Sequence, residues 1–443
     1  MKKLTLIAAL AISTALAACG GGGSGGGNGG NGNQGANPKM VAPVPASEPT
    51  AQPASQPTTQ PASQPATPPA TQPNGGQTPT PVANQIAISI KQVTAGYFNQ
   101  PTASVTICVP GTSTCQTIDN VLVDTGSSGL RLFSSEVTLA LPRVASGSGT
   151  LTECSAFGSG STWGTVASAD ISLAGEVAKS ASVQIIADPA VESIPSSCMA
   201  ESPSDAAVQT AAELGANGII GVGLATADCG TYCVNTTANN VYFSCTASTC
   251  SQTTAAANTQ VANPVSQFAQ DNNGVAITLP AVTTAGLTQV TGTLTFGIGT
   301  QSDNALGTAQ VYTVNTSGEL TTIYGSDTDT DSFIDSGSNG FFFNSSITQC
   351  AITDAPGFYC PASTLTESAM IEGANGNNVS VSFQVANTDT IAAAGVYAVN
   401  GLATTASPGT FDWGLPFFYG RTVYTAINNA STPGGTGPYF AFN

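Results

Sequence analysis

The chain has no histidine among its 443 residues. This absence excludes hydrolysis by a Ser-His-Asp or Cys-His group and zinc binding through histidine. Basic residues are also scarce, because eight Lys and Arg stand against 25 Asp and Glu, for a formal net charge of -17. Eight scattered positive charges cannot form the basic surface that phosphates require, so we expect no nucleic-acid partner.

Charged residues of either sign make up only 7% of the chain, a composition typical of exported proteins. The first residues agree, since Lys2 and Lys3 precede an apolar run that ends in small residues, as in a secretory signal peptide. This run is too short to span a bilayer. Its end, Leu16-Ala17-Ala18-Cys19, resembles a bacterial lipobox. The resemblance implies a lipoprotein signal peptide over residues 1–18 and lipid on Cys19; an ordinary signal peptide with an incidental cysteine is the alternative.

The segment that follows has the composition of a tether. Residues 20–36 are nearly all Gly and Asn, and residues 37–84 repeat Pro with Gln, Thr, Ser and Ala. Such a composition cannot bury an apolar core, so we predict a disordered Gly/Pro-rich tether over residues 19–84. Glycine, not aspartate, follows Cys19, which favours the outer membrane, with either its periplasmic or its cell-surface face possible. Residues 85–443 then remain to fold.

The cysteine count supports export. Setting aside Cys19, ten of the eleven cysteines remain, an even number that predicts five disulfides in an exported protein. Three pairs follow from the spacing: Cys108 with Cys115, Cys154 with Cys198, and Cys350 with Cys360. The other four cysteines allow local pairs (Cys229 with Cys233, Cys245 with Cys250) or nested pairs (Cys233 with Cys245, Cys229 with Cys250). We expect no metal at these cysteines.

From residue 85 onward the pattern predicts mainly β structure. Alternating or β-branched segments separated by Gly, Asn and Ser predict strands; they cover residues 86–90, 103–109, 121–123, 291–298 and 379–385. The best helix candidate is residues 264–270, with Asn263 as cap and Pro264 at the first helical position. So long an all-β chain exceeds one simple sandwich, so we predict two lobes.

Two segments of the chain resemble each other. Residues 120–133 read NVLVDTGSSGLRLF and residues 331–344 read DSFIDSGSNGFFFN. In each, an apolar strand would deliver an aspartate, Asp124 or Asp335, to a tight turn, and a glycine would permit close backbone approach. The supporting turn residues are Thr125, Gly126, Ser127, Ser336, Gly337 and Ser338. If the turns face each other, the two carboxylates can share one proton.

With this pair of motifs, residues 85–443 resemble the pepsin-like aspartic proteases. Two apolar segments ending at or containing Gly, residues 218–223 and 413–418, resemble those that thread beside each aspartate turn in that family. The resemblance implies a two-lobed pepsin-like fold, with an N-terminal β lobe over 85–302, a C-terminal β lobe over 303–443 and a peptide or protein substrate in the cleft between them. It implies no cofactor and no metal, and we expect a monomer. The whole chain also resembles a family of Gram-negative lipoproteins.

The chain departs from the family at the flap, the hairpin that covers the cleft. Phe157-Gly158-Ser159-Gly160 stands where a tyrosine usually precedes the glycine, and Arg131 stands where a tryptophan is common. We expect Phe157 to lie over the substrate, so that its truncation lowers activity and leaves thermal stability nearly unchanged. Trp163 and Trp413 are expected to pack in the interior, with Trp163 the better candidate for contact in the cleft.

These observations predict a lipid-anchored aspartic endopeptidase that activates water between Asp124 and Asp335. The alternative is a surface binding or inhibitor protein that keeps this scaffold without turnover. The presence of both aspartates favours the enzyme. A purely structural module is disfavoured, because structure alone does not require two such turns.

Overall fold

A computed structural model describes residues 83–94, 96–191, 193–199, 206–351 and 357–443. It also contains two short N-terminal strands, β1 (Leu6–Ile7) and β2 (Lys39–Met40), which pair antiparallel. Apart from these strands, the predicted signal peptide, Cys19 and the predicted tether up to residue 82 lie outside the described residues. In the part that is described, no helix is long and apolar enough to cross a membrane.

The described chain is mainly β, as predicted. The strands before residue 302 are β3 (Gln85–Lys91), β4 (Pro101–Cys108), β5 (Cys115–Asp124), β6 (Ser128–Phe133), β7 (Ala145–Ser146), β8 (Gly149–Phe157), β9 (Gly160–Leu173), β10 (Glu176–Ile186), β11 (Gly218–Val222), β12 (Tyr242–Cys245), β13 (Cys250–Gln252), β14 (Gly274–Thr278) and β15 (Gln289–Phe296). The later strands are β16 (Gln310–Thr313), β17 (Leu320–Tyr324), β18 (Asp327–Ile334), β19 (Phe341–Phe342), β20 (Leu365–Glu372), β21 (Asn378–Val385), β22 (Ala403–Thr404), β23 (Asp412–Trp413), β24 (Thr422–Ala426), β25 (Ser431–Thr432), β26 (Gly435–Thr436) and β27 (Tyr439–Phe442).

Helices are few and short in the described ranges. The α-helices are α1 (Ser196–Met199), α2 (Ala211–Leu214), α3 (Gly230–Asn235) and α4 (Thr388–Ala393), and the 3₁₀ helices are η1 (Pro189–Val191), η2 (Pro264–Gln267) and η3 (Leu415–Phe418). The predicted helix after Asn263 is therefore a single 3₁₀ turn. Its start is as expected, because the Asn263 side chain accepts a hydrogen bond from the Val265 amide and Pro264 opens the turn.

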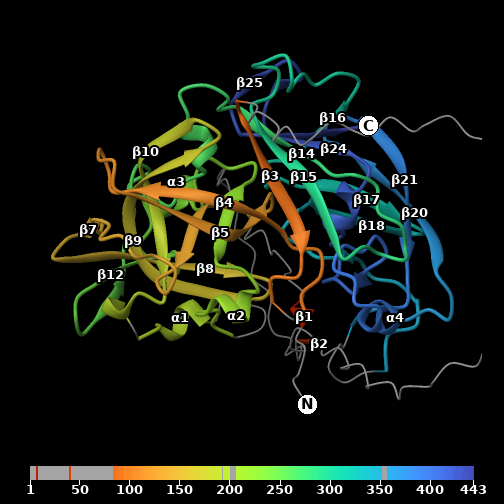
Figure 1. The fold of residues 1–443 in the computed structure, drawn as a ribbon, viewed down its shortest axis with the longest axis horizontal. Helices are drawn as coiled ribbons and strands as arrows, with labels where there is room; N and C mark the ends of the chain where they lie inside the picture. Colours follow the sequence, from red (N-terminus) through yellow and green to blue (C-terminus); the bar gives the residue numbers. More distant parts are fainter. Residues whose placement is uncertain are drawn as a thin grey trace, which may run out of the picture.

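Two sheets organise the fold. The larger has sixteen strands and runs from β13 at one end to β16 at the other; the smaller has seven strands in the order β21-β20-β17-β18-β23-β19-β22. In Figure 1 the strands β4 to β12 gather on one side, β17 to β21 on the other, and β3, β14 and β15 lie between them. The large sheet is continuous across the middle, since β15 pairs with β3 and with β14, and β14 pairs with β24.

Each of the two aspartate turns sits in the same three-stranded arrangement. In the first half, β11 runs parallel to β5 and antiparallel to β6, so that Gly221 lies beside Asp124. In the second half, β23 runs parallel to β18 and antiparallel to β19, and the Asp335 amide donates to the Trp413 carbonyl at 3.1 Å. The two predicted threading segments therefore occupy equivalent places, and the fold repeats one unit twice.

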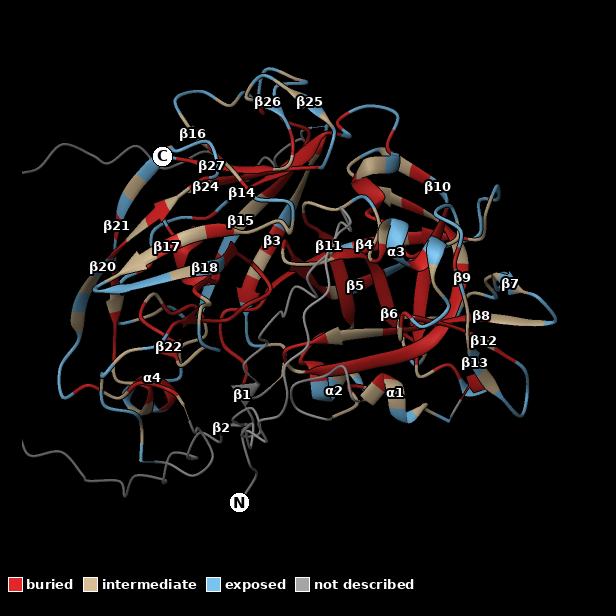
Figure 2. Cartoon of the chain, turned by 180° about the vertical axis from the view of Figure 1, so that it is seen from behind, coloured by how far each residue is buried: buried red, intermediate tan, exposed pale blue. Residues whose placement is uncertain are grey.

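The core forms around these two units. Every residue of β6 and β11 is buried, and Figure 2 shows the strands of this region in red. In the second half, aromatic rings pack on one another: Phe411 stacks on Trp413 at 4.4 Å between centroids, and Phe341 and Phe383 both contact Trp413 edge-on. Burying a ring of this size stabilises the fold by about 1.5–3 kcal/mol. This packing holds β23 between β18 and β19, the two strands that the Asp335 turn connects.

The ten cysteines that the structure describes form five disulfides. The three pairs expected from spacing are present, Cys108–Cys115, Cys154–Cys198 and Cys350–Cys360. For the four ambiguous cysteines the local pairs form, Cys229–Cys233 and Cys245–Cys250. The Cys154–Cys198 bridge joins β8 to α1, whereas the other four close loops of ten residues or fewer in sequence separation.

Candidate active site

The two carboxyl groups of Asp124 and Asp335 face each other. Both side chains are buried, at the ends of β5 and β18 respectively. A single backbone amide, that of Gly126, donates to Asp124 Oδ1 at 2.8 Å and to Asp335 Oδ1 at 3.1 Å. Because one N–H group reaches both acceptors, the carboxyl groups of two residues 211 positions apart share one small space.

Each carboxyl is further held by its own turn. The Ser127 hydroxyl donates to Asp124 Oδ2 at 2.5 Å, and the Ser338 hydroxyl donates to Asp335 Oδ2 at 2.9 Å. The Gly337 amide donates to Asp335 Oδ1 at 2.7 Å. Hydrogen bonds of this kind fix the orientation of both carboxyl groups.

The turns are also locked to each other by reciprocal hydrogen bonds. The Thr125 amide donates to the Ser336 hydroxyl at 3.1 Å, and the Ser336 amide donates to the Thr125 hydroxyl at 2.9 Å. Each hydroxyl then donates onward to the strand opposite, Thr125 to the Ile334 carbonyl and Ser336 to the Val123 carbonyl. The structure thus brings together both aspartates and all six predicted supporting residues.

The glycines of the two turns allow this close approach. A Cβ atom on Gly126 would lie 2.6 Å from the Asp335 Cγ atom, and one on Gly337 would lie 2.7 Å from Asp124 Oδ1. Carbon and oxygen atoms do not approach so closely, so any side chain at either position would displace the opposing carboxyl. Space, and not backbone conformation, requires glycine here, because neither residue has a positive φ.

The electrostatics of the pair favour one proton. Burial first, then the neighbouring Asp124 and Asp412, raise the pKa of Asp335 well above its usual range. Two carboxyls this close cannot both ionise at modest energetic cost, so the pair titrates as a unit. Asp335 is therefore the member that keeps its proton when an ordinary aspartate has lost it.

A third buried carboxyl, that of Asp412, was not predicted. It belongs to β23, pairs with Phe333 of β18, and is fully buried next to the Asp335 turn. Burial raises the pKa of Asp412 well above its usual range, Ser338 lowers it by hydrogen bonding, and Asp124 raises it. The predicted threading segment begins one residue later, at Trp413. An aspartate directly before a segment expected to be buried was the clue available in the sequence.

The predicted flap is a hairpin that covers the pair. Strands β8 and β9 are joined by a turn at Gly158 and Ser159, with Phe157 opposite Gly160. One pocket contains both aspartates together with flap residues, and it is lined by Leu122, Asp124, Phe157, Ser159, Leu214, Ile219, Asp335 and Gly337. The flap prediction and the dyad prediction thus converge on one pocket.

The flap side chains are more deeply packed than expected. Phe157 is 7% exposed and belongs to an apolar cluster with Leu122, Leu214 and Ile219. Its truncation is therefore expected to lower stability as well as activity. Trp163 does not reach the cleft, because it is buried, donates to the Val191 carbonyl at 2.7 Å and packs edge-on against Phe243. Trp413 packs in the interior as predicted.

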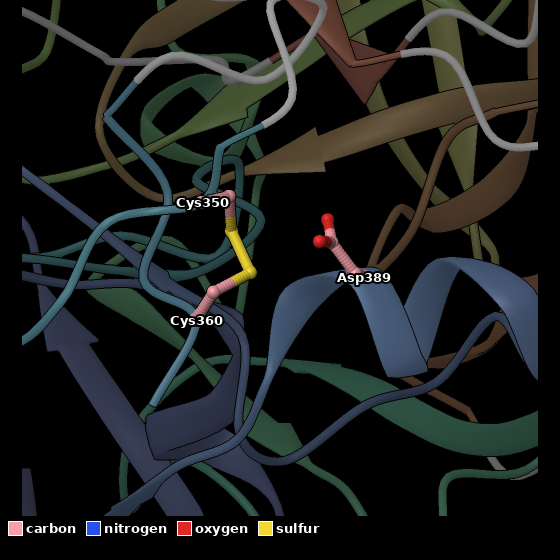
Figure 3. Close-up of side chains that lie close together, drawn as sticks. All are labelled: Cys350, Cys360 and Asp389. Atoms are coloured by element: carbon pink, nitrogen blue, oxygen red, sulfur yellow. A yellow bond between two sulfur atoms is a disulfide. The ribbon is translucent and has the colours of Figure 1, made fainter. Parts of the chain in front are cut away.

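One group of side chains within the described part of the chain has the spacing of a metal site. Cys350, Cys360 and Asp389 offer atoms within 4.8 Å of one another. Figure 3 shows the Asp389 carboxylate beside the two sulfur atoms, which are bonded to each other. A disulfide offers no thiolate to a metal, so this group does not form a metal site in the oxidised protein.

The fold and the paired carboxyls define a β protein with a twofold-repeated aspartate turn. A family model described as "Protein of unknown function (DUF3443)" matches residues 80–442, so the chain belongs to that family. The search of curated proteins found no match. The structure is similar to the crystal structure of an aspartic proteinase from Irpex lacteus, with 16% identity, a TM-score of 0.45, and coverage of 81% of this chain and 96% of that one. At this identity and TM-score the likeness adds nothing to what the geometry of the two turns supports.

Proposed function

We propose that this protein is an aspartic endopeptidase in which Asp124 and Asp335 together activate a water molecule for attack on a peptide bond. The observation that carries the proposal is the Gly126 amide, which donates to both carboxyls at 2.8 and 3.1 Å. Two buried carboxyls sharing one donor can hold a water between them, with one acting as base and the other as acid.

The direction of the Asp335 pKa assigns the roles. Burial raises the pKa of Asp335, so we propose that Asp335 carries the proton and acts as the acid, and that its partner Asp124 acts as the base. Asp124 takes a proton from water as the water oxygen bonds to the scissile carbonyl carbon, and Asp335 gives its proton to the carbonyl oxygen. When the C–N bond breaks, Asp124 returns its proton to the leaving nitrogen and Asp335 recovers one from the tetrahedral hydroxyl.

We propose an extended peptide or protein segment as substrate, bound under the hairpin of β8 and β9, whose residues Phe157 and Ser159 line the pocket of the two aspartates. Apolar side chains, Leu122, Leu214 and Ile219, surround the pair on the side that the flap covers. Since one chain supplies both aspartates, a monomer is sufficient for catalysis. Five disulfides support an exported enzyme, and we propose that lipid on Cys19 anchors it, in the outer membrane.

The mature chain should be assayed for cleavage of a denatured protein between about pH 3 and 7. We expect a bell-shaped pH profile, because activity requires one proton on the pair. Asp124→Asn and Asp335→Asn should each abolish cleavage while circular dichroism shows an unchanged fold, and a statine peptide should inhibit the wild type. Full activity in either variant refutes the dyad. Tight statine binding without cleavage by the wild type would instead identify a binding protein on this scaffold.

The anchor is tested separately on protein purified from membranes of a Gram-negative host. Mass spectrometry should find an N-terminal peptide that begins at Cys19 and carries acyl chains. An unmodified Cys19, or cleavage at another bond, would contradict the lipid anchor without bearing on the dyad.

A further inference from the structure

We propose that Arg131 is a positioning residue that holds the flap over the aspartate pair, through Glu153 and Phe157. This role rests on the proposed peptidase function. Arg131 belongs to β6, the strand that directly follows the Asp124 turn, and its side chain is 1% exposed. Its Nη2 atom lies 2.7 Å from Glu153 Oε1, and the Glu153 side chain is completely buried.

The ion pair links two strands that do not touch in the sheet. Arg131 lies on β6 and Glu153 lies on β8. The strand order β8-β9-β10-β6 places two other strands, β9 and β10, between them. Glu153 lies on β8, the strand that leads into the flap turn. Arg131 therefore connects the catalytic turn directly to the flap strand.

A second contact reaches the flap tip. The guanidinium carbon of Arg131 lies 5.6 Å from the centroid of the Phe157 ring, within the range of a cation–π interaction. Phe157 follows Glu153 by four positions on the same strand, and side chains at even spacing share a face of a strand. Phe157 also lines the pocket of the two aspartates, so this contact connects Arg131 to the flap side of that pocket.

The charges around Arg131 are balanced within the protein. Asp228 Oδ2 lies 3.3 Å from Arg131 Nη2, and the Tyr242 hydroxyl donates to both oxygens of Asp228. Burial first, and then Glu153, raise the pKa of Asp228 well above its usual range. Arg131 is thus the cation that faces two buried carboxyl groups, those of Glu153 and Asp228. Removing the cation would leave a buried carboxylate unpaired, which proteins tolerate poorly.

The test separates flap positioning from general stability. Arg131→Lys keeps the charge and loses the planar fork, whereas Glu153→Gln keeps the shape and loses the charge. The control is Arg143→Lys, because Arg143 also forms an ion pair, in which it donates two hydrogen bonds to Asp188, at 3.0 and 2.9 Å. Hydrogen–deuterium exchange of the full chain is measured in peptides covering residues 154–162 and, as reference, β15.

We expect exchange in the flap peptides to accelerate about tenfold or more in Arg131→Lys and Glu153→Gln, with β15 unchanged and Arg143→Lys like the wild type. With a peptide substrate, KM should rise several-fold more than kcat falls. Unchanged flap exchange in both folded variants, or equal acceleration in β15, would overturn the proposal. If neither variant folds, Phe157→Leu, which removes only the ring, must accelerate flap exchange or the proposal fails. Exchange requires no turnover, so absent cleavage by the wild type would contradict the peptidase proposal alone.

Discussion

Filling the space between the two turns is the most direct test of the paired site. Gly126→Ala adds one methyl group and keeps the backbone N–H that donates to both carboxyls. The new Cβ would lie 2.6 Å from both Cγ and Oδ2 of Asp335. Gly337→Ala is its counterpart, since its Cβ would lie 2.7 Å from Asp124 Oδ1.

The size of the effect follows from these distances. Ordinary contact begins at 3.4 Å, so the Asp335 carboxyl must move by about 0.8 Å to accept the methyl group. Displacing a catalytic group by about 1 Å can lower the rate by about 100-fold. Overpacking of a tight interior site typically costs about 1–3 kcal/mol in the free energy of unfolding. We therefore expect Gly126→Ala and Gly337→Ala each to lose about 100-fold in kcat and to unfold at a lower temperature.

A control separates these two losses. Gly111→Ala places its methyl where no atom lies within 4 Å, but at a φ of +70° that is strained for alanine. It should lose about 1 kcal/mol of stability and keep full activity. The assay is kcat on a denatured protein substrate together with the thermal midpoint of each variant. If Gly126→Ala cleaves as fast as Gly111→Ala, the two carboxyls do not face each other as described.

Three further predictions concern other parts of the molecule. Burial raises the pKa of Asp335 and Asp412, so above a pH of about 3.9 these two residues bind more protons in the folded chain than in the unfolded chain. The free energy of unfolding should therefore fall as the pH rises from that value. In Asp412→Asn the thermal midpoint should fall less steeply with pH than in the wild type. The basic limb of its pH–rate profile should shift to lower pH, because the Asp412 charge no longer raises the pKa of Asp335. An unchanged pH–rate profile would contradict this coupling between Asp412 and Asp335. Phe157→Ala should lower activity, and in urea titrations it should lower the free energy of unfolding by about 3 kcal/mol. A urea midpoint equal to that of the wild type would show that the ring is not part of the core. Replacing Cys154 and Cys198 by serine should cost about 2–5 kcal/mol, whereas the wild type should show no free thiol by mass spectrometry.

Local patterns were sufficient to predict the two turns and five strands: β3, β4, β5, β15 and β21. The alternation in residues 86–90 predicted β3, because one face of that strand packs on the core and alternate side chains point to it. The repeated Asp-Thr/Ser-Gly-Ser segments predicted the turns, because a tight turn depends on residues that are adjacent in the chain. The disulfides Cys108–Cys115 and Cys350–Cys360 were predictable for the same reason, since each closes a short loop.

Contacts between distant segments were decided only by the tertiary structure. Asp412 becomes a neighbour of Asp335 because β23 is threaded beside β18, and nothing in the local sequence specifies that register. Arg131 and Glu153 meet across two intervening strands, and Phe157 is buried because Leu122 and Ile219 come to lie beneath it. The choice between local and nested pairs among the four clustered cysteines also depended on where α3 and β12 lie. Sequence spacing determines which residues are close along the chain, whereas burial and charge pairing depend on which strands the fold places side by side.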